Sequence, residues 1–556
     1  MTRTSIATRL LVLAAAAVAL PQLLACLGHP LKEVQYDTTQ VDQTGFPLAI
    51  NKDVDILFVI DDSGSMAEEQ ALLAKNFGAF IGVLEAPDVK ANYRIGVTTT
   101  DHSNPRCPKA ETTPTNGDLV LSSCIDRAAN GDFIFNGVEP PLDAGYACTD
   151  VCGLTDADLV IRPTSTDKDP SEKPRPWLES IEGKTNIPDG ISTLEAFQCF
   201  GPQGVAGCGF ESHLESMYLA LKQSEAETEQ NYGFLRDDAI LSVVVLTDEM
   251  DCSYNEAHKE IFIDNKVFWN DPTDVVPTSA VCFRAGVECV GSGDPTYEAC
   301  YAENHDVAGN PGASDADAVL HPISRYVDQL QKIEDQKKST DQSQEVLFAL
   351  IGGVPPGYED GGDIVYSSVA DPAFLEDFGI APGCTLGSGQ AVPPVRMREF
   401  AEAFAVGGAR NLFSICQDDY SVALKAIADR IRDQIKPACM PQCVKDINET
   451  TEILDPQCSL VEENPATGVR RPINRCVKDG DEWVPSAGEA VCYVTLVDSD
   501  GLTPTTDDDL SETCKEQGWN LEFKIFRDGP APKGSSVTAS CLVADIAEVT
   551  CPNLGG

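Results

Sequence analysis

Five apolar runs most constrain how this chain can fold. Each is six to nine residues long and nearly free of charge, as expected for strands covered on both faces. The runs are residues 54–60, 93–100, 239–247, 345–353 and 411–416. Helical periodicity occurs between or after them, at residues 65–85, 211–224, 318–336, 397–406 and 419–435. This alternation predicts an α/β fold with a doubly wound, mostly parallel sheet and helices on both faces.

Two long irregular segments interrupt the alternation, at residues 101–200 and 252–312. Both are rich in turn-forming residues and contain cysteines, so we expect insertions stabilised by disulfides. The composition changes near residue 437, where a cysteine-dense segment begins. We therefore expect a sheet domain at 53–436 and a small, mainly β, cysteine-rich C-terminal module at 437–556.

The N-terminal segment is typical of an export signal. Residues 1–25 carry basic residues and then an apolar stretch that is short and interrupted by proline. The segment ends in Leu23–Leu24–Ala25–Cys26, which resembles the lipobox of bacterial lipoproteins. That resemblance implies cleavage before Cys26 and its lipidation, with residues 26–52 as a tether. A plain secretory signal with an incidental cysteine is the alternative.

Cysteine usage indicates an oxidising compartment. The chain has 21 cysteines, and setting Cys26 aside leaves an even number that can pair fully. No CxxC pairs are present, which argues against structural zinc. We therefore expect an exported protein, attached to the bacterial membrane only by lipid, in the outer membrane or at the cell surface.

Strong acidity limits the possible partners. Asp and Glu number 88 against 40 Lys and Arg, giving a formal charge of −48. Such a surface repels nucleic acid and suits divalent cations or basic partners, although acidity also simply keeps exported proteins soluble. The sequence contains no HExxH, GxSxG or Walker motif, so we do not expect an enzyme.

The first apolar run leads directly into a turn of small, oxygen-bearing residues. Asp61, Ser63 and Ser65 alternate there, with Gly64 giving backbone freedom. Ligands of open α/β sheets bind beyond the carboxyl ends of the strands. One carboxylate and two hydroxyls form a set of hard oxygen ligands that suits Mg²⁺. A serine that only caps the following helix is the alternative.

At this point the sequence resembles a known family. The residues FVIDDSGSM (58–66) are similar to the metal-ion-dependent adhesion site, or MIDAS, of von Willebrand factor A (VWA) domains. The resemblance covers roughly residues 53–435 and extends to bacterial surface lipoproteins that carry this domain. It implies a doubly wound parallel sheet and a second aspartate after a later buried strand, for which SVVVLTDEMD nominates Asp248.

One feature departs from the family pattern. The family usually supplies a threonine from a middle loop, but the corresponding place lies near Cys208 and contains none. Glu211 could supply an oxygen to the cation instead, or could only favour the N-terminus of the following helix. Asp62, Thr100 and Glu249 are expected around the ligands rather than among them, and Thr100 could equally only end its strand.

The expected function is that of a metal-ion-dependent adhesion module of the cell envelope. The resemblance implies one divalent cation, Mg²⁺ or else Mn²⁺ or Ca²⁺, with an open position for an acidic side chain of a protein partner. We expect a monomer that binds no nucleic acid. The alternative is a structural envelope scaffold whose protein contacts do not depend on metal.

Overall fold

The computed structural model describes residues 46–48, 52–86, 89–107, 112–338, 345–435 and 438–551, with short gaps in the last range. Those gaps are 449, 452, 465–467, 481, 500, 512–513, 516 and 528–535. The signal segment and Cys26 lie outside the described residues. None of the helices within the described part is long and apolar enough to cross a membrane.

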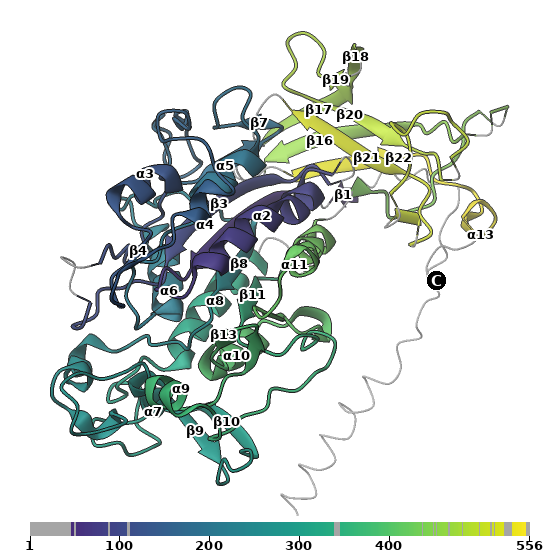
Figure 1. The fold of residues 1–556 in the computed structure, drawn as a ribbon. Coiled ribbons are helices and arrows are strands. Elements are labelled where there is room, and N and C mark those ends of the chain that lie inside the picture. The colour runs from purple at the N-terminus through teal and green to yellow at the C-terminus, as the bar shows by residue number, and fades with distance from the viewer. Residues whose placement is uncertain are drawn as a thin grey trace, which may run out of the picture.

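A seven-stranded sheet forms the centre of the larger domain (Figure 1). Its order is β14-β11-β8-β2-β3-β6-β7, and the first five of these strands run parallel. Their bounds are Leu412–Ser414, Leu347–Gly352, Ile240–Leu246, Asp53–Ile60 and Asn92–Thr99. All five coincide with predicted apolar runs. The prediction of an α/β domain around a mostly parallel sheet is confirmed.

Helices cover both faces of this sheet because successive side chains of a strand point to opposite sides. On one face, Phe58 and its alternate neighbours pack against α2, α5 and α11. On the other, Leu57 and Val59 pack against α6, α8 and α10. The bounds are α2 Ala67–Leu84, α5 Thr193–Phe200, α6 His213–Gln223, α8 Ile323–Lys338, α10 Val395–Glu402 and α11 Ser421–Gln434. The predicted helix at 318–336 begins only at Ile323, directly after Pro322.

The first insertion is more regular than we expected. Strands β6 (Leu178–Ile181) and β7 (Lys184–Thr185) add an antiparallel edge to the central sheet. Sequence reasoning missed them because both are short and β7 is polar. The insertion also forms helices α3 (Cys124–Asn130) and α4 (Tyr146–Thr149) and the hairpin of β4 (Ile134–Phe135) and β5 (Leu142–Asp143).

The second insertion packs with later loops around its own apolar cluster, which includes Phe262, Trp269 and Val281. Its elements are η1 Glu256–Phe262, η2 Lys266–Phe268, α7 Ala280–Gly286 and the hairpin β9 Val287–Val290 with β10 Ala299–Ala302. Helix α9 (Pro372–Phe378), the hairpin β12 (Cys384–Leu386) with β13 (Gly389–Ala391), and η3 (Val406–Gly408) complete the domain.

The C-terminal module forms a second seven-stranded sheet, mainly antiparallel and shaped as a half-barrel. Its order is β1-β22-β16-β17-β20-β21-β15, with β18–β19 as a separate hairpin. The bounds are β15 Ala438–Cys439, β16 Cys458–Asn464, β17 Val469–Arg475, β18 Val477–Asp479, β19 Glu482–Val484, β20 Val491–Leu496, β21 Glu522–Arg527, β22 Ser536–Cys541 and α13 Ala547–Thr550. Strand β1 (Phe46–Leu48), which we expected in the tether, instead pairs with β22.

Disulfides pair every cysteine of the described chain, as the even number predicted. Six lie in the sheet domain: Cys107–Cys208, Cys124–Cys148, Cys152–Cys199, Cys252–Cys282, Cys289–Cys300 and Cys384–Cys416. Four lie in the C-terminal module: Cys439–Cys514, Cys443–Cys551, Cys458–Cys541 and Cys476–Cys492. No bridge joins these two sets, so each domain is cross-linked internally.

Candidate metal centre

The turn after β2 brings together the oxygens of Asp61, Ser63 and Ser65. Asp61 Oδ1 accepts a hydrogen bond from the Ser63 amide at 2.9 Å, and Ser63 Oγ lies 3.3 Å from Ser65 Oγ. Asp61 and Ser63 are buried, whereas Ser65 is exposed. The turn therefore has a buried carboxylate at its base and an exposed hydroxyl at its mouth.

Neither serine caps the helix that follows. Helix α2 begins at Ala67, and the preceding residue, Met66, provides no side-chain cap. The serine hydroxyls contact each other and Asp248 instead. The alternative that Ser63 or Ser65 is only a capping residue is therefore wrong for this structure, and both hydroxyls are available to a ligand.

Asp248 approaches this turn from a neighbouring strand. Strands β2 and β8 are parallel partners in which Ile60 is paired with Leu246, so their carboxyl ends meet. Ser65 Oγ donates a hydrogen bond to Asp248 Oδ1 at 3.1 Å. The structure thus brings the side chains of Ser63, Ser65 and Asp248 into contact at the sheet edge, with Asp61 at the base of the same turn.

Thr247 and His213 hold the buried aspartate, and sequence reasoning did not identify this relay. Thr247 Oγ1 donates to Asp61 Oδ2 at 2.6 Å. The Thr247 hydroxyl has only one proton to donate, and that proton goes to Asp61. His213 Nε2, which lies 2.7 Å from Thr247 Oγ1, must therefore donate its own proton to that oxygen. The Glu249 amide also donates to Thr247 Oγ1. Asp61 is therefore fixed by a chain of hydrogen bonds reaching helix α6.

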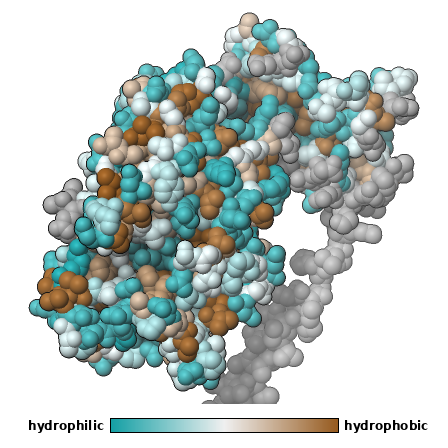
Figure 2. Space-filling model, in the orientation of Figure 1, coloured by the Kyte–Doolittle hydropathy of each residue, from teal (hydrophilic) through white to brown (hydrophobic). Residues whose placement is uncertain are grey.

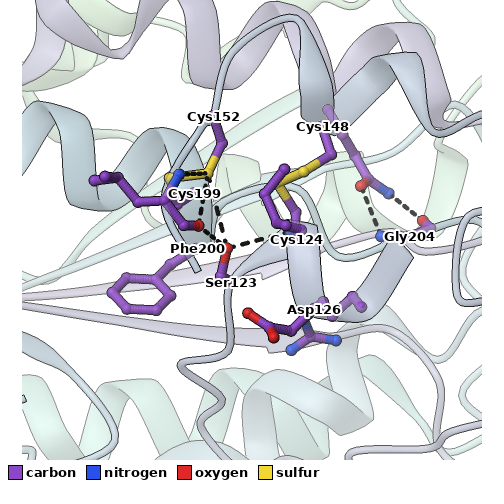
Figure 3. The surroundings of a disulfide bond; sticks show 12 residues. Ser123, Cys124, Asp126, Cys148, Cys152, Cys199, Phe200 and Gly204 are labelled. Carbon is purple, nitrogen blue, oxygen red and sulfur yellow. Dashed lines mark hydrogen bonds between the residues drawn. A yellow bond between two sulfur atoms is a disulfide. The ribbon is translucent and has the colours of Figure 1, made fainter. Parts of the chain in front are cut away.

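Gln70 joins the metal-site turn to the loop before α6. Its side-chain amide donates to the backbone oxygens of Asp61 and Gly204, at 2.7 and 2.8 Å. Its oxygen accepts from the amides of Gln203 and Gly204. Figure 3 shows Gly204 close to the Cys124–Cys148 and Cys152–Cys199 disulfides of the first insertion. The sequence signal that could have identified Gln70 is its polar side chain on the otherwise apolar stripe of its helix.

Glu211 and Glu249 form a second acidic layer beside Asp61. Glu211 is 1% exposed, and its Oε1 has no hydrogen-bond partner, nor has Glu249 Oε2. Burial, followed by the charges of Glu249 and Asp61, raises the pKa of Glu211 well above its usual range. Burial likewise raises the pKa of Glu249 to about 8. Both carboxyls therefore lack the positive neighbour that would stabilise their ionised form.

The negative charge around the candidate site is not balanced by lysine or arginine side chains among the described residues. In the described part of the chain, Asp61, Asp248, Glu211 and Glu249 form no ion pair with lysine or arginine, and His213 lies 3.7 Å from Asp61 Oδ2. Burial and the charges of Asp61 and Glu249 raise the pKa of Asp248. Hard oxygens with unbalanced negative charge suit Mg²⁺ or Ca²⁺, so the residues present fit a divalent cation.

Of the remaining predicted neighbours, Thr100 follows β3 and Asp62 follows β2. Thr100 is buried, and its backbone joins Ile60 and Ser212 through hydrogen bonds of 3.2 and 3.0 Å. Asp62 is 4% exposed, and its carbonyl accepts from the Gly207 amide. The middle loop at Cys208 is fixed by its disulfide to Cys107. Cys208 therefore offers no free thiol to a ligand.

Two groups of three Cys or Asp residues with ligand atoms within 4.8 Å of one another occur in the described chain, and neither includes Asp61 or Asp248. Cys124, Cys148 and Cys152 lie close together, but their sulfurs are used in disulfides (Figure 3). Asp498, Asp508 and Asp509 gather beside the C-terminal sheet. The Asp498 carboxylate accepts the amides of Leu502 and Thr503, which is typical of a loop stabilised by its own aspartate.

Comparisons with known proteins give no family. No protein-family model matches the chain, and no curated protein matches it. Among solved structures it is similar to the pilus adhesin SpaC of Lactobacillus rhamnosus GG, with a TM-score of 0.27 and 8% identity over 89% of this chain and 40% of SpaC. The pilus adhesin RrgA of Streptococcus pneumoniae gives 0.21 and 7%, over 90% and 58%.

This chain therefore spans less than two thirds of the length of either adhesin. Such low TM-scores define neither its fold nor its function. The functional argument depends on the geometry of the candidate site.

Proposed function

We propose that this protein is a cation-dependent adhesion module of the VWA type. Asp61, Ser63, Ser65 and Asp248 would hold one divalent cation, most simply Mg²⁺, with Mn²⁺ or Ca²⁺ as alternatives. Glu211 would add an oxygen or negative charge from the middle loop. An acidic side chain of a protein partner would complete the coordination.

The observation that carries this proposal is the continuous contact from Ser63 through Ser65 to Asp248. These residues come from segments 183 positions apart, yet Ser65 and Asp248 are hydrogen-bonded at the edge of one sheet. They lie where open α/β sheets bind ligands. The exposed Ser65 leaves the cation reachable from solvent, as a partner carboxylate requires.

Each residue would have a distinct part in binding. Asp61 and Asp248 supply charge, and the serine hydroxyls are neutral ligands that leave the ion electrophilic toward a further carboxylate. Thr247 and Gln70 hold Asp61 in place, because hydrogen bonds around a ligand fix its orientation. A cation bound here supplies Lewis-acid attraction for an anionic group, and no chemical step is required.

The test compares cation binding with partner binding. The variant Ser63→Ala/Ser65→Ala removes two hydroxyl ligands but keeps the hydrogen bonds that Asp61 makes to the fold. Calorimetric titration should show Mg²⁺ and Mn²⁺ affinity at least tenfold weaker than in wild type. The control Ser324→Ala, at an exposed position on α8, should bind like wild type.

Capture of partners from cell-surface extracts, with and without EDTA, then tests adhesion. We expect capture to require the cation and to be lost in the double serine variant. Capture that is unaffected by EDTA and by both serine changes would favour the envelope scaffold instead. A non-binding variant that melts at the wild-type temperature excludes misfolding as the cause.

The proposed setting is the outside of a bacterial cell. Lipidation at Cys26 would anchor a monomer, and the ten disulfides agree with an oxidising compartment. Mass spectrometry of the N-terminal peptide of the mature protein tests the anchor. A Cys26 thiol without lipid, or an N-terminus other than Cys26, would contradict it.

A further inference from the structure

A pair of buried aspartates lies beside the candidate metal centre and takes no part in it. Asp62 follows β2 and Asp101 follows β3, and they are 4% and 0% exposed. Strands β2 and β3 are parallel, with Ile60 paired to Thr99. Asp62 and Asp101 each lie two residues beyond this pair, and the charge of Asp101 acts on Asp62.

Each of these carboxylates has one oxygen without a hydrogen-bond partner. Asp101 Oδ1 accepts the Ser103 amide at 3.1 Å, but its Oδ2 has no partner, and neither has Asp62 Oδ1. A buried carboxylate oxygen without a partner costs free energy, so such atoms are rare without a reason. The donors beside them are neutral: the Thr99 side chain for Asp62, and the Thr112 side chain and the Cys208 amide for Asp101.

The protein itself does not supply a positive partner to these carboxylates within the described residues. Neither aspartate forms an ion pair with lysine or arginine. The charge of Arg127 acts on Asp62, but the hydrogen bonds of Arg127 go to the backbone oxygens of Ser122 and Gln203. The only other nearby group that could carry positive charge is His102.

The backbone of the middle loop closes over this pair. The Gly207 amide donates to the Asp62 carbonyl at 2.8 Å. A Cβ at Gly207 would lie 2.4 Å from Asp62 Oδ1, so only glycine allows this approach. The Cys107–Cys208 disulfide then fixes the loop. The backbone of the middle loop therefore packs directly against the Asp62 carboxylate at the end of β2.

We propose that Asp62 and Asp101 bind a second divalent cation, of the Ca²⁺ class, between the ends of β2 and β3. Ca²⁺ fits better than Mg²⁺ because it accepts irregular oxygen sites and gives up its waters more readily. The ion would join β2, β3 and the middle loop that carries Glu211. It is independent of the cation proposed at Asp61, Ser63, Ser65 and Asp248.

The experiment counts Ca²⁺ ions bound to the purified full-length protein with its disulfides oxidised. Equilibrium dialysis followed by elemental analysis is applied to wild type, Asp62→Asn/Asp101→Asn and Asp248→Asn. We expect the aspartate-pair variant to bind one Ca²⁺ fewer than wild type. Asp248→Asn should still bind the ion at Asp62 and Asp101. This variant therefore distinguishes failure of the proposed adhesion site from failure of the site at Asp62 and Asp101.

Thermal melting excludes a merely structural effect. In EDTA, the aspartate-pair variant should melt at or above the wild-type temperature, because two repelling carboxylates have become neutral amides. Added Ca²⁺ should raise its melting temperature less than that of wild type. Should the double variant aggregate, Asp62→Asn and Asp101→Asn singly are each expected to weaken Ca²⁺ binding at least tenfold.

An equal number of bound ions in wild type and the pair variants would overturn the proposal. That result would mean that the two carboxyls share a proton instead of a metal ion. Wild-type protein that binds no Ca²⁺ at all would overturn it as well.

Discussion

At the scale of single residues, Asp61 shows how a metal-site carboxylate is held in this fold. Its two oxygens accept a backbone amide from its own turn and a hydroxyl from a neighbouring strand. Thr247 in turn accepts from His213 and from the Glu249 amide. The orientation of Asp61 therefore depends on one threonine hydroxyl that contacts three groups.

The first prediction concerns removal of the Thr247 hydroxyl. Thr247→Val keeps the shape of the side chain but removes the donor to Asp61 Oδ2. We expect the affinity for Mg²⁺ or Mn²⁺ to fall about 10- to 100-fold, the usual effect of losing a group that orients a ligand. Thr247→Ser retains the hydroxyl and should stay within a fewfold of wild type. Titration calorimetry measures both, and equal affinities for the two variants would contradict the relay.

A buried lysine far from the site gives a prediction about pH. Lys337 is 2% exposed and donates to the backbone oxygens of Arg236 and Ala239. Burial lowers its pKa from 10.5 to about 8. Between pH 8 and pH 10.5, Lys337 is protonated in the unfolded chain but has lost its proton in the folded protein. Lys337 therefore makes the free energy of unfolding rise with pH in this window, and it causes no such rise below pH 8.

In the variant Lys337→Met this contribution is absent. We expect the free energy of unfolding to rise less between pH 8 and pH 9.5 than in wild type, by about 1–2 kcal/mol. Urea titration at both pH values measures the difference. The exposed lysine in Lys332→Met serves as the control and should follow the wild-type pH profile.

At the scale of elements, the middle loop before α6 positions much of the site. It contacts Gln70 through Gly204, Asp62 through Gly207, and the end of β3 through Ser212. Near Cys208, where the VWA pattern has a threonine that this chain lacks, the cysteine fixes the loop by a disulfide. The loop therefore acts as a rigid cover over the ends of β2 and β3.

Two glycines of this loop provide a matched pair of variants. A Cβ at Gly207 would lie 2.4 Å from the Asp62 carboxylate, whereas one at Gly209 would meet nothing within 4 Å. Gly207→Ala should lower the free energy of unfolding by about 1–3 kcal/mol, the usual cost of forcing atoms into a packed site. Gly209→Ala should change it by less than about 0.5 kcal/mol. Chemical denaturation with the same protocol compares them, and equal effects would argue against the close approach.

At the scale of the whole molecule, two separately cross-linked domains share one chain. The sheet domain and the C-terminal module have separate apolar clusters and separate sets of disulfides. On the face in Figure 2, hydrophobic residues form small groups among hydrophilic ones.

Disulfide loop length gives the prediction at this scale. Cys289–Cys300 and Cys458–Cys541 both join directly paired antiparallel residues with Cα atoms 4.1 Å apart. Their sequence separations are 11 and 83 residues. Chain-entropy reasoning then makes the longer bridge more stabilising by about 2 kcal/mol. We expect alanine pairs at 458 and 541 to destabilise their domain more than those at 289 and 300.

Hydrogen exchange of each hairpin, in each variant, measures that loss locally. Only the domain with the altered bridge should lose protection. A larger loss at the short bridge would show that native-state contacts, and not the length of the closed loop, decide the effect.

The sequence by itself determined the parts that depend on local pattern. Buried parallel strands require uninterrupted apolar runs, so the five main strands could be predicted within two residues. Asp61, Ser63 and Ser65 were expected together because they share one turn, and the resemblance to VWA domains nominated Asp248. The short β6 and β7 could not be predicted, since their pairing with β3 depends on the completed sheet.

Only the tertiary structure decided which distant groups meet. His213 and Thr247 approach Asp61 from separate elements. The pairing of 20 cysteines was likewise left open by the sequence. The physical reason is the same in each case: a residue's type and spacing specify the face or turn it occupies, but contacts across the sheet depend on how all the strands and loops pack together.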